Sequence, residues 1–249
     1  MTLLRLNLRR GESTIRFAKQ PEWLDTLGNP LSDAAVDFYI RGRRVLALVH
    51  GYNVTEAMDA YALIANMVSA NYDTVIGVTW PGSKIALAFW FAEMRANKAG
   101  RMLAAGLLPH LADINSDNGR FDMEAHSLGC RVALESLRSG LEIRNLILAA
   151  AAVHDESVEV GELYGSVIEG RTQRTLVAYS SKDPVLRRAF KIAEWDNALG
   201  LTGPRSDKSV MLPTTLEAID FSSVIKEHSG YKRSAEFYNV WEQTVKISV

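Results

Sequence analysis

Ser127 stands where a serine side chain can act as a nucleophile. Residues 120–126 alternate apolar and charged side chains as a short strand does, and apolar residues recur at helical spacing from residue 130 onward. The four residues between, His-Ser-Leu-Gly at 126–129, leave no room for a loop. So sharp a turn strains the serine backbone and pushes its side chain out of the sheet, while small residues at Ala125 and Gly129 let strand and helix approach. The competing interpretation is that Ser127 only caps the helix.

A nucleophilic serine requires a base that takes its proton during attack. His126 adjoins Ser127 and should leave the turn in another direction, whereas His228 lies in a loop between the last predicted strand and the last predicted helix. We therefore predict that His228 is the base. The other histidines are interpreted differently: His50 as a loop brace, His110 as a core or surface residue, and His154 as lying too early in the chain to be the base.

The imidazole in turn requires a carboxylate that fixes its tautomer and stabilises its positive charge. Asp183, in Ser-Lys-Asp-Pro, follows a predicted strand directly, and we predict that it fills this role. The alternative for Asp183 is a helix cap, because Asp before Pro commonly begins a helix. Asp155, which follows the preceding strand, is the competing acid, and Asp220 should point to a face of the sheet.

Two backbone N–H groups are candidates to stabilise a tetrahedral oxyanion. The N–H of Leu128 begins the helix after Ser127, and the N–H of Tyr52 follows His50-Gly51 at the end of a long apolar strand. Gly51 permits the backbone bend that this loop needs. Each such donor stabilises a transition state by roughly 3–4 kcal/mol.

The elements that must position these residues alternate along the chain. Apolar or alternating runs predict strands, and helical spacing fills most of the intervals, so we expect an open parallel sheet flanked by helices. The candidate residues follow the carboxyl ends of these strands, which is the edge where active sites of such sheets lie. We expect strands at 4–8, 13–18, 36–40, 45–49, 75–79, 120–126, 146–153, 175–180 and 216–221, and helices at 55–71, 82–118 (broken near Gly100 and Pro109), from 184, and at 236–247.

Composition excludes several classes of function. The chain has 249 residues, 47% hydrophobic and 23% charged, and a formal net charge of −1, so no global charge attracts nucleic acid or an anionic membrane. One cysteine allows neither an internal disulfide nor a cysteine metal cluster. The first residues are too charged for a signal peptide, and no apolar run reaches the length of about 18 residues that a membrane span needs. We expect one cytoplasmic domain over residues 1–249, without cofactor or metal.

These residues together resemble the α/β-hydrolase superfamily. The order Ser127, Asp183, His228, the His-Gly-Tyr-Asn loop at 50–53 and the Ala-His-Ser-Leu-Gly elbow carry the resemblance. The strings V-H-G-Y-N, T-W-P-G-S and A-H-S-L-G-C-R-V further resemble a little-characterised branch of small serine hydrolases. The resemblance covers residue 45 to the C-terminus and leaves residues 1–44 unplaced. It implies a three-layer fold with a mostly parallel sheet, a Ser-Asp-His triad, and oxyanion donors at Tyr52 and Leu128.

Two-step acyl transfer follows from this resemblance, and carboxylic esters are the expected substrates because an alkoxide leaves more easily than an amide nitrogen. Only 21 residues, 154–174, separate two strands between which large cap domains are usually inserted, so we expect no large cap and short- to medium-chain esters. The apolar run 85–92, which includes Phe89, is an acyl-pocket wall, a short lid or ordinary helix core. Trp80, together with His50 and Gly51, is a candidate substrate contact. Thioesterase, amidase or acyltransferase activity and a non-catalytic binding protein remain the alternatives.

Overall fold

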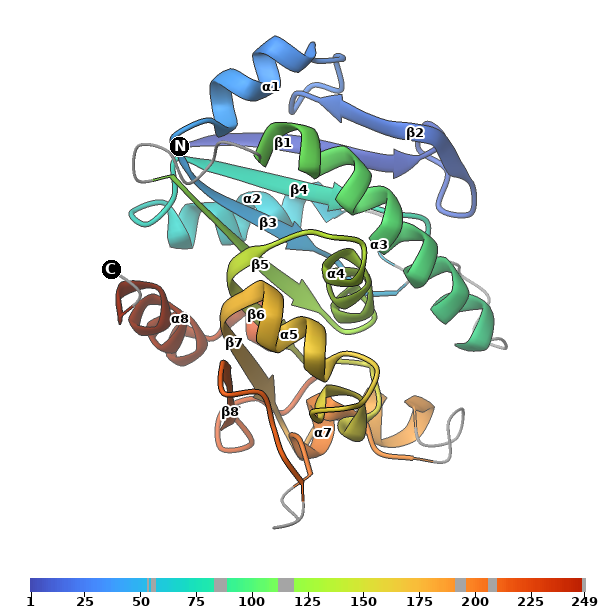
Figure 1. Cartoon of the computed structure of the whole chain (residues 1–249), viewed down its shortest axis with the longest axis vertical. Helices are drawn as coiled ribbons and strands as arrows, with labels where there is room; N and C mark the ends of the chain where they lie inside the picture. Colours follow the sequence, from blue (N-terminus) through green and yellow to red (C-terminus); the bar gives the residue numbers. More distant parts are fainter. Residues whose placement is uncertain are drawn as a thin grey trace.

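A mostly parallel sheet runs through the centre of the computed structural model (Figure 1). The structure describes residues 1–52, 54, 57–82, 89–111, 119–190, 196–205 and 210–247. Within them the strand order is β2-β1-β4-β3-β5-β6-β7-β8, and each pair is parallel except β1 with β2. The strands are β1 (Thr2–Arg9), β2 (Phe17–Leu24), β3 (Arg44–Val49), β4 (Thr74–Thr79), β5 (Arg120–His126), β6 (Ile143–Ala149), β7 (Thr172–Tyr179) and β8 (Leu216–Asp220).

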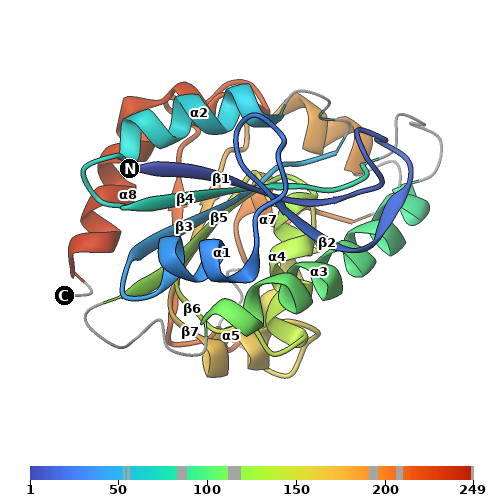
Figure 2. The ribbon, with the colours of Figure 1, turned by 90° about the horizontal axis from the view of Figure 1, so that it is seen from above.

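Helices cover both faces of this sheet, which confirms the predicted three-layer arrangement. Seen from above, α2 and α8 lie on one face and α1, α3, α4 and α5 on the other (Figure 2). The central strands are buried on both sides, which explains their continuous apolar runs. The helices are α1 (Asp33–Ile40), α2 (Ala57–Val68), α3 (Phe89–Leu111), α4 (Gly129–Arg138), α5 (Gly165–Arg171), α7 (Leu199–Thr202) and α8 (Ala235–Ile247).

The predicted strand at 36–40 is wrong, because these residues belong to α1. The Ser32 side chain accepts a hydrogen bond from the N–H of Ala35 at 3.3 Å and so caps the helix. Val36 and Ile40, four residues apart, then lie on the same side of the helix and are both fully buried. The second strand also begins later than expected, at Phe17 rather than at residue 13.

The predicted breaks in the helix after β4 are also wrong, because α3 continues through Gly100 and Pro109. Gly100 is required by packing, since a Cβ there would lie 2.4 Å from the Cβ of Glu135 in α4. Pro109 lies in the last turn of α3, where the helix ends two residues later. The fourth predicted core strand likewise ends at Ala149 rather than at residue 153.

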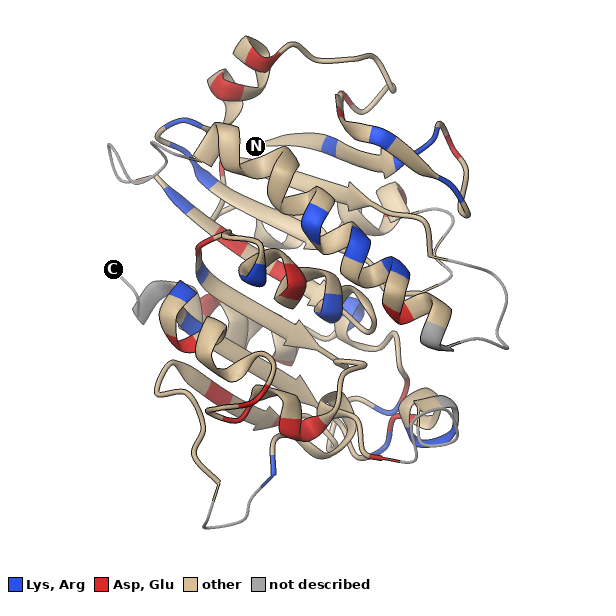
Figure 3. Ribbon diagram, turned by 45° about the vertical axis from the view of Figure 1, so that its right-hand side comes forward, with Lys and Arg blue, Asp and Glu red and all other residues tan. Residues whose placement is uncertain are grey.

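Charged side chains help to fix α4, the helix that follows Ser127. Residues of both signs occur along α3 and α4, which lie side by side (Figure 3). Arg131 of α4 pairs with Glu93 of α3 at 2.7 Å, and its Nε donates to the side chain of Asn97 at 3.0 Å. Among the described helices, none has both the length and the apolar character that crossing a membrane requires.

Candidate active site

Ser127 occupies the turn between β5 and α4 with a backbone φ of 57°, which is unusual for a residue with a side chain. Backbone hydrogen bonds hold this conformation. The Ser127 N–H donates to the carbonyl of Ala149 at 2.9 Å, and its own carbonyl accepts from the N–H groups of Cys130 and Ala152 at 3.0 and 3.2 Å. The neighbouring strand β6 therefore fixes the turn, and the strained conformation expected for a nucleophile elbow is present.

Two glycines make room for this turn. A Cβ on Gly129 would lie 2.5 Å from the carbonyl oxygen of His50 and 2.6 Å from that of Val49, both of which are backbone atoms. A Cβ on Gly51 would lie 2.7 Å from the Cβ of Ser127. The loop after β3 and the start of α4 thus touch each other through backbone alone, as the sequence predicted for Gly129.

Ser127, His228 and Asp183 form one chain of hydrogen bonds. The Nε2 atom of His228 lies 2.8 Å from the Oγ of Ser127, and its Nδ1 lies 2.6 Å from the Oδ2 of Asp183. When Nδ1–H donates to the carboxylate, Nε2 is left as an acceptor for the serine hydroxyl. These three residues come from the ends of β5 and β7 and from the loop after β8, and they meet in the order that an acyl-transfer triad requires.

Asp183 is fully buried and is held by three hydrogen bonds. Its Oδ1 accepts from the N–H groups of Val185 and Leu186 at 2.9 and 3.0 Å, while Oδ2 faces His228. Burial by itself raises the pKa of this carboxyl, but the hydrogen bond and the positive charge of His228 outweigh that effect, so the pKa lies below its ordinary value. Asp183 is therefore both a cap for the following turn and the acid that pairs with His228.

The competing acids lie elsewhere. Asp155 is buried in a short 3₁₀ turn, Asp155–Val158, where its Oδ2 accepts from Thr202 at 3.5 Å and its Oδ1 lies 3.5 Å from the Nε of Arg205. Asp220 ends β8 and accepts a hydrogen bond from the N–H of Ser222 at 2.8 Å. In the part of the chain that the structure describes, Nδ1 of His228 pairs with Asp183 and with neither of these carboxylates.

His126 supports the loop that carries His228. Its Nε2 lies 2.7 Å from the backbone carbonyl of His228, and the two rings are 4.8 Å apart at 58°. Burial, with a further contribution from His228, lowers the pKa of His126 to about 4, so its neutral ring donates Nε2–H to that carbonyl. The sequence placed His126 apart from the serine side chain and gave no signal for this contact.

His50 braces the loop after β3 from inside the protein. Its Nδ1 lies 2.7 Å from the carbonyl of Gly51, and its Nε2 accepts from the backbone N–H of Trp80 at 3.2 Å and lies 3.1 Å from the Nη2 of Arg9. Burial lowers the pKa of His50 to about 3 and keeps the ring neutral. The arrangement favours the brace over a substrate contact for this histidine.

Trp80 and Arg9 complete this brace. Trp80 is fully buried, its ring stacks on His50 at 5.6 Å, and its Nε1 donates to the carbonyl of His50 at 2.8 Å, so it lies in the core rather than at a surface where it would contact a substrate. Arg9, at the end of β1, donates from Nε to the carbonyl of Trp80 at 3.0 Å and from Nη2 to that of Val54 at 2.7 Å. Arg9 has no role that could be predicted from the sequence, because nothing local to residues 1–44 indicates that their first strand pairs with β4.

Leu128 and Tyr52 lie at the positions predicted for oxyanion donors. Leu128 directly precedes α4, and its N–H donates to no other described residue. Tyr52 follows Gly51, where an added Cβ would lie 2.7 Å from the Cβ of Ser127. Asn53 and residues 85–88 lie outside the described residues, as does the side chain of Phe89, although its backbone begins α3.

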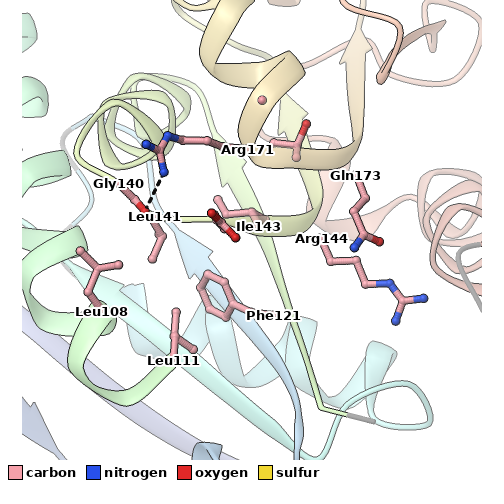
Figure 4. A pocket seen from close by; sticks show the side chains of 12 residues that line it. Leu108, Leu111, Phe121, Gly140, Leu141, Ile143, Arg144, Arg171 and Gln173 are labelled. Carbon is pink, nitrogen blue, oxygen red and sulfur yellow. Dashed lines mark hydrogen bonds between the residues drawn. The ribbon is translucent and has the colours of Figure 1, made fainter. Parts of the chain in front are cut away.

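Two cavities lie at opposite ends of the central strands. One of about 130 Å³ borders Gly51, His126 and Ser229, next to the residues just described. A larger one of about 440 Å³ lies where β5 and β6 begin, between the ends of α3 and α5 (Figure 4). The larger cavity is therefore remote from Ser127, and its wall includes Leu108, Leu111, Phe121, Leu141, Arg144 and Arg171.

A family model agrees with this architecture. Residues 38–232 match the model of a family described as alpha/beta hydrolase of unknown function (DUF900). A search of curated proteins found no match. Among solved structures, an esterase from Pyrococcus furiosus aligns with 82% of this chain and 81% of its own at 12% identity, with a TM-score of 0.46. A Thermus thermophilus protein aligns with 82% of this chain and 90% of its own at 12% identity, with a TM-score of 0.49. A cold-adapted esterase from an Arctic intertidal metagenomic library aligns with 91% of this chain and 86% of its own at 14% identity, with a TM-score of 0.41.

Proposed function

The chain belongs to the α/β-hydrolase family of unknown function (DUF900), and from this we propose that it is a serine hydrolase that cleaves carboxylic esters. The observation that carries the proposal is the hydrogen-bonded chain from Ser127 through His228 to Asp183, with 2.8 and 2.6 Å between the bonded atoms. A serine needs this geometry to become nucleophilic, and a structural serine does not. The strained backbone of Ser127 supports the same role.

The proposed mechanism proceeds through an acyl-enzyme. The Oγ of Ser127 attacks the ester carbonyl carbon while Nε2 of His228 takes the hydroxyl proton, and the carbonyl oxygen becomes an oxyanion that accepts from the N–H groups of Leu128 and Tyr52. The C–O bond to the leaving group then breaks, and His228 returns its proton to the departing alkoxide. Water repeats both steps on the acyl-enzyme and releases the carboxylic acid.

Asp183 contributes by holding His228. Its buried carboxylate accepts from Nδ1–H, which fixes the tautomer whose Nε2 can receive a proton, and it stabilises the imidazolium that forms. The proposed chemistry needs neither metal nor cofactor, because each proton moves between groups of the chain, the substrate and water.

Short- to medium-chain esters are the proposed substrates. The segment between β6 and β7, residues 150–171, holds only a 3₁₀ turn and α5, too little chain for a large cap over the site. We also propose that residues 1–249 form one domain, because β1 pairs with β4 and Arg9 reaches the loop beside Ser127.

Hydrolysis of graded chromogenic esters tests the proposal. The protein should cleave p-nitrophenyl acetate and butyrate faster than a matched thioester or anilide, and Ser127→Ala and His228→Ala should remove this activity. A thioester preference would assign the same machinery to a thioesterase, and an anilide preference to an amidase. If the wild type and Ser127→Ala cleave each compound of the panel at the same rate, or cleave none of them, the proposal of a hydrolase fails and a binding function takes its place.

A further inference from the structure

Glu124 is a buried carboxyl group that the proposed mechanism does not use. It lies on β5 two residues before His126, and 6% of its surface is exposed. It has no hydrogen bond or ion pair with any residue in the described part of the chain. Its carboxyl is not among the fully enclosed polar atoms that lack a partner, so it is open to a molecule in the cavity that it lines.

Glu124 lines the cavity of about 130 Å³ beside the candidate active site. The wall on the other side comes from α2, through Ala57, Ala60 and Ile64, and from the loop that follows His228. The wall that α2 contributes is apolar. A cavity of about 150 Å³ can hold a benzene molecule, so this one has room for roughly four to six non-hydrogen atoms.

His126 supplies a second hydrogen-bonding group to the same cavity. Because its Nε2–H donates to the carbonyl of His228, its Nδ1 is an acceptor, and Nδ1 lies 3.3 Å from the place where a Cβ of Gly51 would stand. His126 and Gly51 both line the cavity. Burial raises the pKa of Glu124 to about 8, so near neutral pH its carboxyl is protonated and has an O–H to donate.

A hydroxyl group complements this pair of partners, because it accepts one hydrogen bond and donates another. An alkylammonium ion would lose its hydration in an apolar cavity whose wall also includes the cationic Lys232. A carboxylate would lose its hydration as well, and it has no hydrogen to donate to Nδ1 of His126. An uncharged alcohol incurs neither of these costs.

We propose that this cavity binds a short aliphatic alcohol of about four to six non-hydrogen atoms, with its hydroxyl between Glu124 and His126 and its alkyl chain against α2. The alcohol is either a free molecule or the hydroxyl-bearing end of a substrate. The binding does not depend on turnover, so it stands apart from the proposed hydrolysis.

Binding of butan-1-ol to the Ser127→Ala protein, measured by ligand-observed NMR titration, tests the proposal without any turnover. Butan-1-ol should bind at least about tenfold more tightly than n-butylammonium or butyrate, because each of these ions loses hydration. Ala60→Phe fills the cavity and should abolish binding, whereas Ala62→Phe, on the exposed side of α2, should leave it unchanged. Thermal unfolding of each variant shows whether it is folded.

Substitutions of Glu124 separate hydrogen bonding from shape. Glu124→Gln keeps a donor and an acceptor, so butan-1-ol should still bind, while Glu124→Leu should weaken binding by about tenfold. In the protein that retains Glu124, affinity should fall about tenfold from pH 7 to pH 9 as the protonated fraction falls, and Glu124→Gln should remove this dependence. The titratable groups whose charges face Glu124 or line the cavity with it are Tyr61, Tyr238, Cys130, Tyr231, His50, His126 and Lys232.

Three results would overturn the proposal: no butan-1-ol binding, equal binding by Ala60→Phe and Ala62→Phe, or no loss on Glu124→Leu. Displacement of butan-1-ol by methyl 6-hydroxyhexanoate, but not by methyl butyrate, would assign the site to the hydroxyl-bearing end of a substrate. Simultaneous binding of butan-1-ol and the hydroxy ester would assign it to a free alcohol. Both of these outcomes support an alcohol site, and neither depends on whether the wild-type protein hydrolyses esters.

Discussion

Replacement of Asp183 by asparagine should nearly abolish ester hydrolysis while leaving the protein folded. The Oδ1 of Asp183 accepts from two backbone N–H groups, and an asparagine oxygen in the same place would keep both bonds. Its NH₂ group would then face Nδ1 of His228, where Oδ2 now lies at 2.6 Å. Two donors cannot share one hydrogen bond, so His228 would move its proton to Nε2 and present an N–H to Ser127 instead of an acceptor.

The size of this effect follows from the tautomer. The variant must restore the reactive tautomer at the expense of a donor-to-donor contact, and the same change in an unrelated serine protease lowers kcat by about 10⁴-fold. This corresponds to about 5 kcal/mol of lost transition-state stabilisation. Stability should fall less, by about 1–3 kcal/mol, because one charge-assisted hydrogen bond is removed and two others remain.

Initial rates with p-nitrophenyl butyrate, together with thermal unfolding of each variant, measure both effects. Asp155→Asn is the matched control, since Asp155 is also a buried carboxylate but contacts Thr202 and Arg205 instead of His228. We expect Asp155→Asn to retain kcat/KM within about threefold of wild type, a change of under 1 kcal/mol. If Asp155→Asn loses more activity than Asp183→Asn, or if folded Asp183→Asn keeps a tenth of the wild-type rate, the assignment of the acid is wrong.

Three further perturbations test how the site is held. Gly129→Ala drives a Cβ against the carbonyl of His50, so it should cost about 1–3 kcal/mol of stability and lower kcat, while Gly170→Ala, which meets no atom within 4 Å, should do neither. His126→Phe removes the hydrogen bond to the His228 carbonyl and should lower kcat about tenfold with little change in KM. His126→Gln should restore part of the lost kcat. Equal rates for the wild type and both variants would refute the support that His126 gives to the His228 loop. The pKa of His50 is about 3 in the folded protein and near 6.5 in the unfolded chain. The contribution of His50 to the free energy of unfolding should therefore be fully present above pH 6.5 and be lost as the pH falls below it, by about 2 kcal/mol at pH 5. Urea unfolding at each pH measures this loss. His50→Asn should flatten that slope, and an unchanged slope would contradict the neutral brace.

The turn at Ser127 could be predicted because its requirements are local. A serine between a strand and a helix, with small residues two positions away on each side, specifies its own geometry. The alternation of strands and helices likewise predicted the parallel sheet, because period and spacing are properties of adjacent residues. The order Ser127, Asp183 and His228 added a constraint from the family resemblance.

Contacts between distant segments could not be predicted in the same way. Arg9 reaches Trp80 and His50 only because β1 pairs with β4, and no pattern in the first strand specifies that pairing. Trp80 follows a strand, which fixes its place in the chain but not whether its ring faces a pocket or the core. Glu124 and His126 share a face by their spacing of two, yet the missing partner of Glu124 is visible only in the fold.

Short segments differ from the expected structure where a cap or a contact outweighs the local pattern. Residues 36–40 contain side chains typical of strands, but the cap at Ser32 starts a helix before them. Gly100 was expected to break a helix, although its missing side chain is what lets α3 lie against α4. In both cases the deciding interaction involves residues outside the short segment whose pattern gave the prediction.

Covalent labelling tests the claim that Ser127 is a nucleophile activated by His228. A fluorophosphonate should add one phosphonyl group to the wild-type protein, and peptide mass spectrometry should locate that group on Ser127. Ser127→Ala should remain unlabelled, and His228→Ala should react far more slowly, because the Oγ would lose the acceptor now 2.8 Å away. Labelling of Ser127→Ala at the wild-type rate, or modification at another residue, would contradict the claim and leave the turn without a catalytic role.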